Sequence, residues 1–366
     1  MTKMRAAIKA RPEPGLEMMQ VDIPPIGPRD VLIKVKASSI CGTDLHIYKW
    51  DQWAQGRCKH IPLIQGHELC GEVVDVGPAV TEVAVGDFVS AESHIVCNTC
   101  DLCKTGNGHI CRNTKIIGVD CDGSFAEYIA LPVENAWKNP EGMPVEIAVL
   151  MENFGNAVHT AFAADIRSKK VLVTGCGPVG CMTIAVCKAI GARAVYATDI
   201  SKYRVDLARK MGADAIFLAG QDDLISGVRD MTQGEGVDVL LEMSGAPSAI
   251  RDGFSLLKYG GQAVAFGLPS KPIEFDLSNL VIFKGITVFG VVGRRLWETW
   301  YQARGLLKSG AVDLRPVVTH KFDLKDADKG FEVMAAGSSG KVVFYPQGQG
   351  VPETNHDKVN PRVGEL

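Results

Sequence analysis

Residues 171–199 (VLVTGCGPVGCMTIAVCKAIGARAVYATD) constrain the fold of this chain more than any other stretch. The short apolar run at their start predicts a buried strand, and Gly175, Gly177 and Gly180 then predict a tight turn into an apolar helix. A second predicted strand ends at Asp199. A strand, a helix and a further strand in direct succession indicate a parallel sheet with helices packed on its faces.

The three glycines and the aspartate suit one type of ligand. The first glycine permits the turn, the second lets a pyrophosphate approach the backbone, and the third lets the helix pack closely on the strand. The helix N-terminus offers free N–H groups to phosphates. Asp199, nineteen residues after Gly180, is placed to accept hydrogen bonds from ribose hydroxyls and to repel a 2′-phosphate. The pattern therefore predicts NAD rather than NADP; a glycine turn in some other α/β sheet is the alternative.

The alternation of strands and helices continues beyond Asp199, which supports a doubly wound parallel sheet without appeal to the glycines. The predicted elements are a helix at 204–213, a strand at 237–245, a helix at 248–260, a strand at 261–268 and a late strand at 281–293. The late strand is either an edge that pairs with another subunit or an interior strand.

The first 150 residues have a different rhythm. Short apolar or alternating runs separated by Gly, Pro and Asp occur at 31–38, 71–77, 87–92 and 125–132, and no long helical period appears. This region is therefore predicted to be a β-rich domain with many turns. A length of 366 residues with 46% hydrophobic content is enough for two such cores.

Charge and hydropathy exclude two classes of protein. The net charge of −3 leaves no broad basic field, which argues against nucleic acid as the main partner. The N-terminus lacks the apolar run of a secretory signal, and no segment has the ~18 consecutive apolar residues of a membrane span. We therefore expect a cytoplasmic enzyme that acts on a small molecule.

Four of the eleven cysteines are crowded together at Cys97, Cys100, Cys103 and Cys111. Four thiolates at this spacing can fill a tetrahedral zinc site and leave no position for water, so the predicted site is structural. A disulfide pair, a cluster of free thiols or an iron–sulfur cluster is the alternative. A zinc module that binds nucleic acid is disfavoured because the lobe has no extended basic face. The remaining cysteines outside position 41 are expected to be small apolar residues: Cys58, Cys70, Cys121, Cys176, Cys181 and Cys187.

A second metal site is indicated by Cys41 and His67. A carboxylate from Glu68, which follows His67 directly, or from the later Glu152 would complete three ligands and leave an open fourth position. An alcohol bound at that position would be polarised and its pKa lowered.

Residues 66–80 carry the pattern Gly-His-Glu-x-x-Gly-x5-Gly-x-x-Val. This pattern resembles the signature of the zinc-containing medium-chain dehydrogenase/reductase family, and the resemblance covers residues 3 to 345. It implies an α/β protein in which a Rossmann doubly wound parallel sheet binds NAD at residues 152–296. Residues 1–151 and 297–345 would form a β-rich GroES-like catalytic domain. Residues 346–366 are polar and are expected to form a flexible tail.

The resemblance also implies roles for single residues around the metal. Cys41, His67 and Glu68 match the catalytic zinc ligands, so that each subunit would bind one catalytic and one structural zinc. Glu152 matches an acidic residue near the metal that acts in proton transfer or as an alternate ligand. Thr43 and His46 match a relay that carries the alcohol proton out of a closed site.

Further matches lie in the cofactor domain. Besides the three glycines, the positions that match dinucleotide contacts are Val179, Asp199 and Arg204. Those that match the nicotinamide side are Phe266, Gly267, Leu268, Val291 and Val292.

Five longer strings resemble the branch of the family that acts on L-threonine. They are CGTDLHIYKWDQWAQ from Cys41, CRNTKIIGVD from Cys111, FGNAVHTAF from Phe154, LEMSGAP from Leu241 and GRRLWETWY from Gly293. The implied reaction is NAD-dependent oxidation of the secondary alcohol to L-2-amino-3-oxobutanoate in a homo-oligomer, expected to be a tetramer. A polyol or butanediol dehydrogenase on the same scaffold is the alternative. A non-catalytic scaffold is disfavoured because every ligand and the relay are present.

One position departs from the family pattern, and three other residues have ordinary structural interpretations. Relatives usually carry Pro after the acidic residue of the Glu152 segment, whereas this chain has Asn153, which is expected to loosen that segment. Trp297 and Trp300 are expected to pack in the core rather than contact substrate, and His320 is expected to be a satisfied structural histidine.

Overall fold

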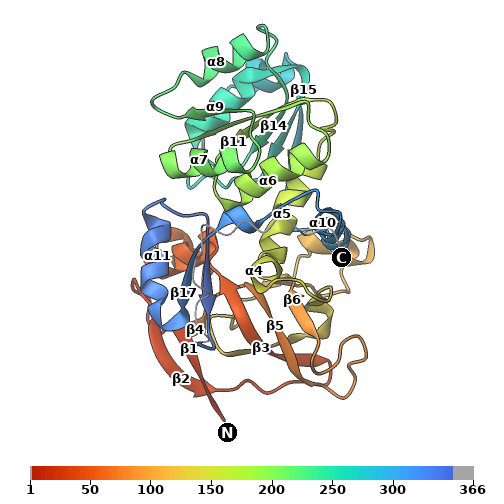
Figure 1. Ribbon diagram of the computed structural model, residues 1–366, viewed down its shortest axis with the longest axis vertical. Coiled ribbons are helices and arrows are strands. Elements are labelled where there is room, and N and C mark those ends of the chain that lie inside the picture. The colour runs from red at the N-terminus through yellow and green to blue at the C-terminus, as the bar shows by residue number, and fades with distance from the viewer. Residues whose placement is uncertain (1, 349–366) are drawn as a thin grey trace.

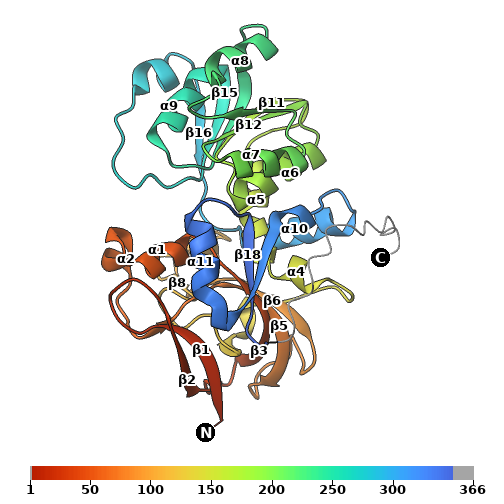
Figure 2. The same cartoon turned by 60° about the vertical axis from the view of Figure 1, so that its left-hand side comes forward.

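The computed structural model describes residues 2–348. Its elements form two parts, one above the other in Figure 1, with α5 (Met151–Phe162) and α10 (Glu298–Lys308) at the junction. Figure 2 shows the same arrangement from the side.

The upper part in Figure 1 is built on a six-stranded sheet in the order β13-β12-β11-β14-β15-β16, and every pair in it is parallel. This confirms the predicted doubly wound sheet. The chain passes from β11 outward to β12 and β13 and then returns to β14 on the other side of β11, so the strand order reverses between β11 and β14. A ligand crevice is expected outside the carboxyl ends of these two strands.

The strands of this sheet are β11 (Lys170–Thr174), β12 (Ala194–Asp199), β13 (Ala215–Leu218), β14 (Val237–Glu242), β15 (Leu257–Ala265) and β16 (Thr287–Gly290). The connecting helices are α6 (Pro178–Ala189), α7 (Lys202–Lys210), α8 (Leu224–Met231) and α9 (Pro247–Leu256).

The late strand predicted at 281–293 is shorter than expected. Ser278–Ile282 forms a π-helical turn, and only Thr287–Gly290 is extended. The Lys284 ammonium donates to the carbonyl oxygens of Phe254, Ser255 and Leu257, which holds residue 284 against the end of α9 and the start of β15. The strand lies at the edge of the sheet, so the interior alternative was wrong.

The lower part is rich in β-structure, as predicted. Its main sheet has seven strands in the order β10-β6-β5-β3-β18-β17, with β9 also paired to β3, and smaller sheets have the orders β2-β1-β4 and β7-β8. β18 (Lys341–Tyr345) pairs antiparallel with β3 (Asp30–Ser39). The C-terminal segment therefore returns to complete the sheet formed by the N-terminal third of the chain.

The other strands of this part are β1 (Lys3–Lys9), β2 (Glu17–Asp22), β4 (Leu63–Ile64), β5 (Glu68–Val76), β6 (Phe88–Ala91), β7 (His94–Ile95), β8 (Lys115–Ile116), β9 (Tyr128–Pro132), β10 (Ala136–Lys138) and β17 (Val318–Asp323). Its helices are α1 (Gly42–Lys49), α2 (Gln52–Arg57), α3 (Asp101–Lys104), α4 (Val145–Ala148) and α11 (Ala327–Ala335), with 3-10 turns at Gly108–Ile110, Val133–Asn135, Arg315–Val317 and Leu324–Asp326.

One apolar core runs through the junction. Phe154 and Val158 of α5 are fully buried with Ile184 of α6 and Trp300 of α10. The burial of Trp300 agrees with the expected core packing, and Trp297 stacks on Trp137 beside it, with ring centroids 6.1 Å apart. The predicted boundary at residue 152 falls in the first turn of α5, a helix that packs on elements of both parts.

Three minor predictions can be compared with the structure. The six cysteines expected to be apolar are buried or, in the case of Cys121, half-buried. The imidazole of His320 has a partner, with Nδ1 2.9 Å from Oγ1 of Thr319. Pro346 and Gln347, assigned to the tail, are instead held by hydrogen bonds to Arg5, Val35 and Glu127, whereas residues 349–366 lie outside the described residues.

Across residues 2–348, we find no helix with the length and apolar character that a membrane crossing requires.

Candidate active site

The four cysteines of the predicted structural site lie together. The thiol sulfurs of Cys97, Cys100, Cys103 and Cys111 are all within 4.8 Å of one another. Cys111 Sγ lies 3.4 Å from Cys97 Sγ, and Cys100 Sγ lies 3.5 Å from Cys103 Sγ. A disulfide requires about 2.05 Å, whereas sulfurs at the corners of a tetrahedron with zinc–sulfur bonds of about 2.3 Å are about 3.8 Å apart. The spacing therefore fits zinc and excludes the disulfide alternative.

The local backbone supports thiolates at this site. The N–H groups of Cys97 and Asn113 donate to Cys111 Sγ, and that of Cys100 donates to Cys97 Sγ. Hydrogen bonds from Thr99 and from the Cys100 amide lower the pKa of Cys97 to about 5. Zinc binds the deprotonated form, so these donors favour the ligand state.

The second cluster joins two segments of the lower part. Cys41 is the N-cap of α1, His67 directly precedes β5, and Glu68 is the first residue of β5. The ligand atoms of Cys41, His67 and Glu68 lie within 4.8 Å of one another. The structure therefore brings together the three residues predicted to ligate the catalytic metal.

Asp44, for which no role was predicted, connects these two segments. Its buried carboxylate accepts hydrogen bonds from the backbone N–H of Cys41 at 2.8 Å and of Gly66 at 3.2 Å. It also lies 3.6 Å from Nδ1 of His67. The spacing of Asp44 from Cys41 is that of a capping box, and this is the one signal in the sequence that could have revealed it.

The charge around this cluster suits a bound cation. Asp44, Glu68, Glu92 and Glu152 are buried here, and the buried cations beside them are Lys341 and Arg294. Burial alone would lower the pKa of His67, but Asp44 and Cys41 raise it well above its usual value. The site therefore favours an added positive charge, which a divalent metal ion would supply.

Glu68 is held from the side of the C-terminal strand. Its carboxylate accepts from the Lys341 ammonium at 2.5 Å and from the Ser39 hydroxyl. Lys341 begins β18 and is almost fully buried, so the return of the chain to this sheet places a cation behind Glu68. Breaking such a pair leaves an uncompensated buried charge, at a cost of roughly 3–5 kcal/mol.

Glu152 lies near the same cluster but is bound differently. One carboxylate oxygen accepts from the Ser93 hydroxyl at 2.6 Å and lies 2.7 Å from Nη1 of Arg294. The other oxygen, Oε2, is buried and has no hydrogen-bond partner. Since Glu152 is close enough for its charge to act on His67 and Glu68, this oxygen is available to the metal site or to a bound substrate.

The relay residues are both on α1. Thr43 is half-buried and His46 is exposed, and their spacing of three residues places them on one face of the helix. Nδ1 of His46 lies 2.5 Å from a carboxylate oxygen of Asp51. The relay positions therefore run from partial burial toward solvent.

The glycine turn has the geometry expected of a phosphate cradle. A Cβ built on Gly177, the N-cap of α6, would meet no atom within 4 Å, so the backbone there is open to a ligand. A Cβ on Gly180 would lie 2.0 Å from the carbonyl oxygen of Gly175, so the close contact between helix and turn requires glycine. Gly175 itself has a φ of +91°, in the region that favours glycine.

The remaining predicted cofactor residues lie at the carboxyl edge of the parallel sheet. Asp199 ends β12, and its carboxylate accepts from the backbone N–H of Cys176 at 2.7 Å and of Ser201 at 2.8 Å, which fixes its direction. Nε of Arg204, on α7, is buried and has no partner. The loops after β15 and β16 contain the other positions: Phe266, Gly267 and Leu268, and Val291 and Val292, with Leu268 and Val292 exposed. Val179 lies in the first turn of α6.

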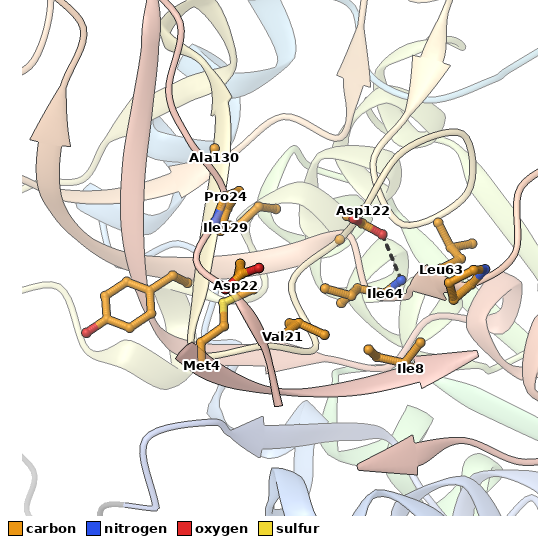
Figure 3. A pocket seen from close by; sticks show the side chains of 13 residues that line it. Met4, Ile8, Val21, Asp22, Pro24, Leu63, Ile64, Asp122, Ile129 and Ala130 are labelled. Atoms are coloured by element: carbon orange, nitrogen blue, oxygen red, sulfur yellow. Dashed lines mark hydrogen bonds between the residues drawn. The ribbon is translucent and has the colours of Figure 1, made fainter. Parts of the chain in front are cut away.

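A separate cavity of about 190 Å³ lies away from these clusters. Figure 3 shows Met4, Ile8 and Val21 on its wall, with Asp122 accepting a hydrogen bond from the Ile64 amide. Its lining contains none of the predicted site residues.

Comparison with known families defines the class of protein. Residues 27–141 match the model of the alcohol dehydrogenase GroES-like domain, and residues 178–309 match that of zinc-binding dehydrogenases. The chain belongs to the zinc-containing medium-chain dehydrogenase/reductase family.

The chain is similar to particular members of this family. The chain is 51% identical to L-threonine 3-dehydrogenase of Symbiobacterium thermophilum, over 94% of this chain and 98% of that protein. It is 50% identical to L-threonine 3-dehydrogenase of Pyrococcus furiosus, over 93% and 98%. Among solved structures, 2R,3R-butanediol dehydrogenase of Bacillus subtilis superposes with a TM-score of 0.85 at 28% identity, over 94% of this chain and 99% of that one. An alcohol dehydrogenase of Escherichia coli CFT073 complexed with NADH superposes with a TM-score of 0.86 at 25% sequence identity. This match covers 94% of this chain and 100% of that one.

Besides Asp44, three charged residues of the site were missed because they lie outside the ligand motifs. All three are buried: Glu92 follows β6, Arg294 follows β16, and Lys341 is the first residue of β18. A single charged residue has no periodic or spacing signal, so only the fold shows that these three lie around the cluster of Cys41, His67 and Glu68.

Proposed function

We propose that this protein oxidises the secondary hydroxyl of L-threonine with NAD, giving L-2-amino-3-oxobutanoate, NADH and a proton. The observation that carries the proposal is a sequence identity of 50–51% to several curated L-threonine 3-dehydrogenases, over 93–94% of this chain. The clustering of Cys41, His67 and Glu68 supports it.

The residues present would hold the catalytic zinc and the NAD that the reaction requires, and also a structural zinc. Cys41, His67 and Glu68 would bind the catalytic zinc, and the four cysteines of the lobe would bind the structural zinc. Bound at the first cluster, zinc would lower the pKa of a coordinated hydroxyl group. NAD would accept the hydride at its nicotinamide ring. The glycine turn would hold the pyrophosphate of NAD, and Asp199 and Arg204 would contact its adenosine ribose.

The protein's own part in the chemistry is to place the hydroxyl and to remove its proton. The Thr43 hydroxyl accepts this proton at its side-chain oxygen and at the same time gives up its own proton toward His46. His46 then passes a proton to water, because a charge trapped in a closed site would be costly. Glu152, held by Ser93 and Arg294, has an unpaired oxygen that can accept a proton or a hydrogen bond from the substrate. The loops at 266–268 and 291–292 would position the nicotinamide ring.

We also propose that the protein works in the cytoplasm as a homotetramer in threonine catabolism. The edge position of β16 supports association between copies, since its backbone hydrogen-bonding groups on one side are available to another strand. Apolar side chains are exposed along and beside this edge: Leu277, Ile282, Phe283, Val288 and Val292. Light scattering on the purified protein measures the subunit number.

Initial rates of NADH formation with L-threonine, sorbitol and 2,3-butanediol test the substrate assignment. The proposal expects kcat/KM for threonine to exceed that for the other two alcohols by at least about 100-fold, because a site built for the ammonium and carboxylate leaves polar groups unpaired with a diol. A preference for butanediol would instead support the alternative, which the 0.85 TM-score with the Bacillus subtilis enzyme motivates. No turnover with any of the three would support a non-catalytic scaffold.

A further inference from the structure

The turn after α1 brings a carboxylate to the outer relay residue. Asp51 Oδ2 lies 2.5 Å from Nδ1 of His46, and these two side chains are five residues apart. The contact is made possible by Trp50, whose φ of +51° reverses the chain directly after the helix. A left-handed conformation in a residue with a side chain costs roughly 1–2 kcal/mol, so the surrounding structure must hold the turn.

Several contacts hold this turn. The backbone N–H of Asp51 donates to the carbonyl oxygen of His46 at 3.3 Å, and Nε2 of Gln55 donates to that of Trp50 at 2.9 Å. The ammonium of Lys9, which is buried, donates to the carbonyl oxygen of Tyr48 at 3.0 Å and lies 5.4 Å from the centre of the Trp50 ring. The side chains of Gln55, which follows the turn, and of Lys9, from the N-terminal strand β1, therefore both hold the turn in place.

Asp51 has a second, structural task. Its other oxygen, Oδ1, accepts from the backbone N–H of Ala54 at 3.1 Å and caps α2. One carboxylate thus caps a helix with one oxygen and contacts His46 with the other. The Trp53 ring lies on another side of the imidazole, with the ring centres 5.6 Å apart.

The exposure of the pair shows that stability is a minor part of its role. The side chains of His46 and Asp51 are 53% and 37% exposed, and an ion pair in such a position contributes less than about 1 kcal/mol. The contact instead determines which nitrogen of the imidazole carries the hydrogen. A carboxylate only accepts hydrogen bonds, so Nδ1 must carry the proton and Nε2 is left with a free lone pair.

We propose that Asp51 is a positioning residue for His46: it holds the proton on Nδ1 and so keeps Nε2 ready to accept the proton that leaves through Thr43. The inference rests on the function proposed above, in which His46 is the outer member of the relay. When Nε2 takes the proton, the imidazolium is stabilised by the Asp51 carboxylate until water removes a proton from the exposed ring. No oxidant, reductant or further group is needed.

Asp51→Asn is the informative variant. Asparagine caps helices as well as aspartate does, so α2 keeps its hydrogen bond from Ala54. With its oxygen engaged there, the amide NH₂ faces His46 and donates to Nδ1, which moves the ring proton to Nε2. We expect kcat to fall about 10–100-fold, with KM for threonine and NAD within about twofold of wild type.

A matched control and a double variant separate positioning from capping. Asp223→Asn makes the same change at the cap of α8, where Asp223 accepts from the Ser226 amide at 3.0 Å, and should leave kcat unchanged. In a His46→Gln background, Asp51→Asn should have no further effect, because the residue through which it acts is absent. An equal loss of kcat in that background, or a kcat within twofold of wild type for Asp51→Asn alone, would overturn the inference.

The ring proton can also be located without an activity assay. In protein labelled with ¹⁵N-histidine, the His46 nitrogens are assigned by their absence from His46→Gln. We expect the protonated nitrogen to be Nδ1 in wild type and Nε2 in Asp51→Asn; the same tautomer in both would sink the inference. If wild type fails to oxidise threonine, the proposed function is wrong, but these spectra still decide whether Asp51 sets the tautomer.

Discussion

Nη1 of Arg294 lies 2.7 Å from Oε1 of Glu152, although 141 residues of sequence separate them. Arg294 follows the last strand of the parallel sheet, and Glu152 lies in the first turn of α5, the helix that precedes this sheet in the chain. The same guanidinium pairs with Glu92 and donates to the Ser93 hydroxyl at 2.9 Å. The segments before and after the parallel sheet therefore meet beside the cluster of Cys41, His67 and Glu68. The Glu152 carboxylate, whose Oε2 has no partner, is held in place there by Arg294 and Ser93.

The pairing of Glu92 predicts a component of acid sensitivity. Burial would raise the pKa of Glu92, but Arg294 outweighs it and lowers the value to about 2. Because the folded-state value lies below the unfolded value, the stabilisation is complete above about pH 4.5 and is lost as pH falls toward 2, about 3 kcal/mol in total and about 1 kcal/mol by pH 4. Urea unfolding between pH 6 and 4, followed by tryptophan fluorescence, should show this loss in wild type and less of it in Glu92→Gln. Parallel pH profiles for the two proteins would contradict the assignment.

Cys41→Ser and His67→Ala should each remove the catalytic metal. We expect turnover to fall by more than about 100-fold, since loss of a ligand should cost at least as much as the 10–100-fold typical of residues behind the ligands. Zinc content by elemental analysis should drop from two to one per subunit, because the cysteine lobe is untouched. Turnover at the wild-type level in either variant would show that this cluster has no metal role.

Cys97→Ser should remove the other zinc. We expect a fall of more than about 5 °C in the thermal midpoint, because a structural zinc contributes directly to folding free energy. Cys121→Ser is the matched control, since Cys121 lies outside both clusters and the change should leave the zinc content at two. Equal zinc content in the two variants would refute the structural site.

Asp199→Ala should relax the preference for NAD. The loss of hydrogen bonds to a charged group predicts a fall of about 10–100-fold in kcat/KM for NAD, and removal of the negative charge should improve use of NADP. Asp214→Ala is the control for a general loss of stability. Asp214 directly precedes β13, and its carboxylate also accepts a backbone hydrogen bond, from Val195 of β12 at 2.7 Å. An unchanged ratio of the two cofactors in Asp199→Ala would count against a ribose contact.

Asn153→Pro should be tolerated. Residue 153 lies in the first turn of α5, where a backbone N–H has no partner within the helix, so proline removes no hydrogen bond. The buried Asn153 Oδ1 has no partner either. We expect a gain of about 0.4–1 kcal/mol in unfolding free energy. Since Ser93 and Arg294 hold the Glu152 carboxylate, kcat should stay within about twofold; a large change would show that the backbone at 153 aims Glu152.

Much of this architecture could be read from local patterns. The strand, glycine turn and helix at 170–189 occur where predicted, because apolar periodicity and glycine punctuation act over a few residues. The cysteine lobe could be predicted for a related reason: four cysteines in close spacing have few other uses in a chain of this kind. Cys41 is not closely spaced with His67 and Glu68, and the grouping of all three was predicted from the resemblance to a family pattern. The late strand was predicted too long because its first residues form a π-helical turn and the Lys284 side chain bonds to carbonyl oxygens of residues 254–257, which lie outside the segment.

The sequence by itself determined which residues could hold a metal and a dinucleotide, because ligand type, spacing and the glycine turn are local properties of the chain. The tertiary structure alone decided what surrounds them. Lys341 reaches Glu68 across 273 residues, and Arg294 reaches Glu92 across 202. Such pairs form only because β18 returns to β3 and α5 packs on α6 of one part and on β5 and β6 of the other. A buried charge finds its partner through packing rather than through sequence distance.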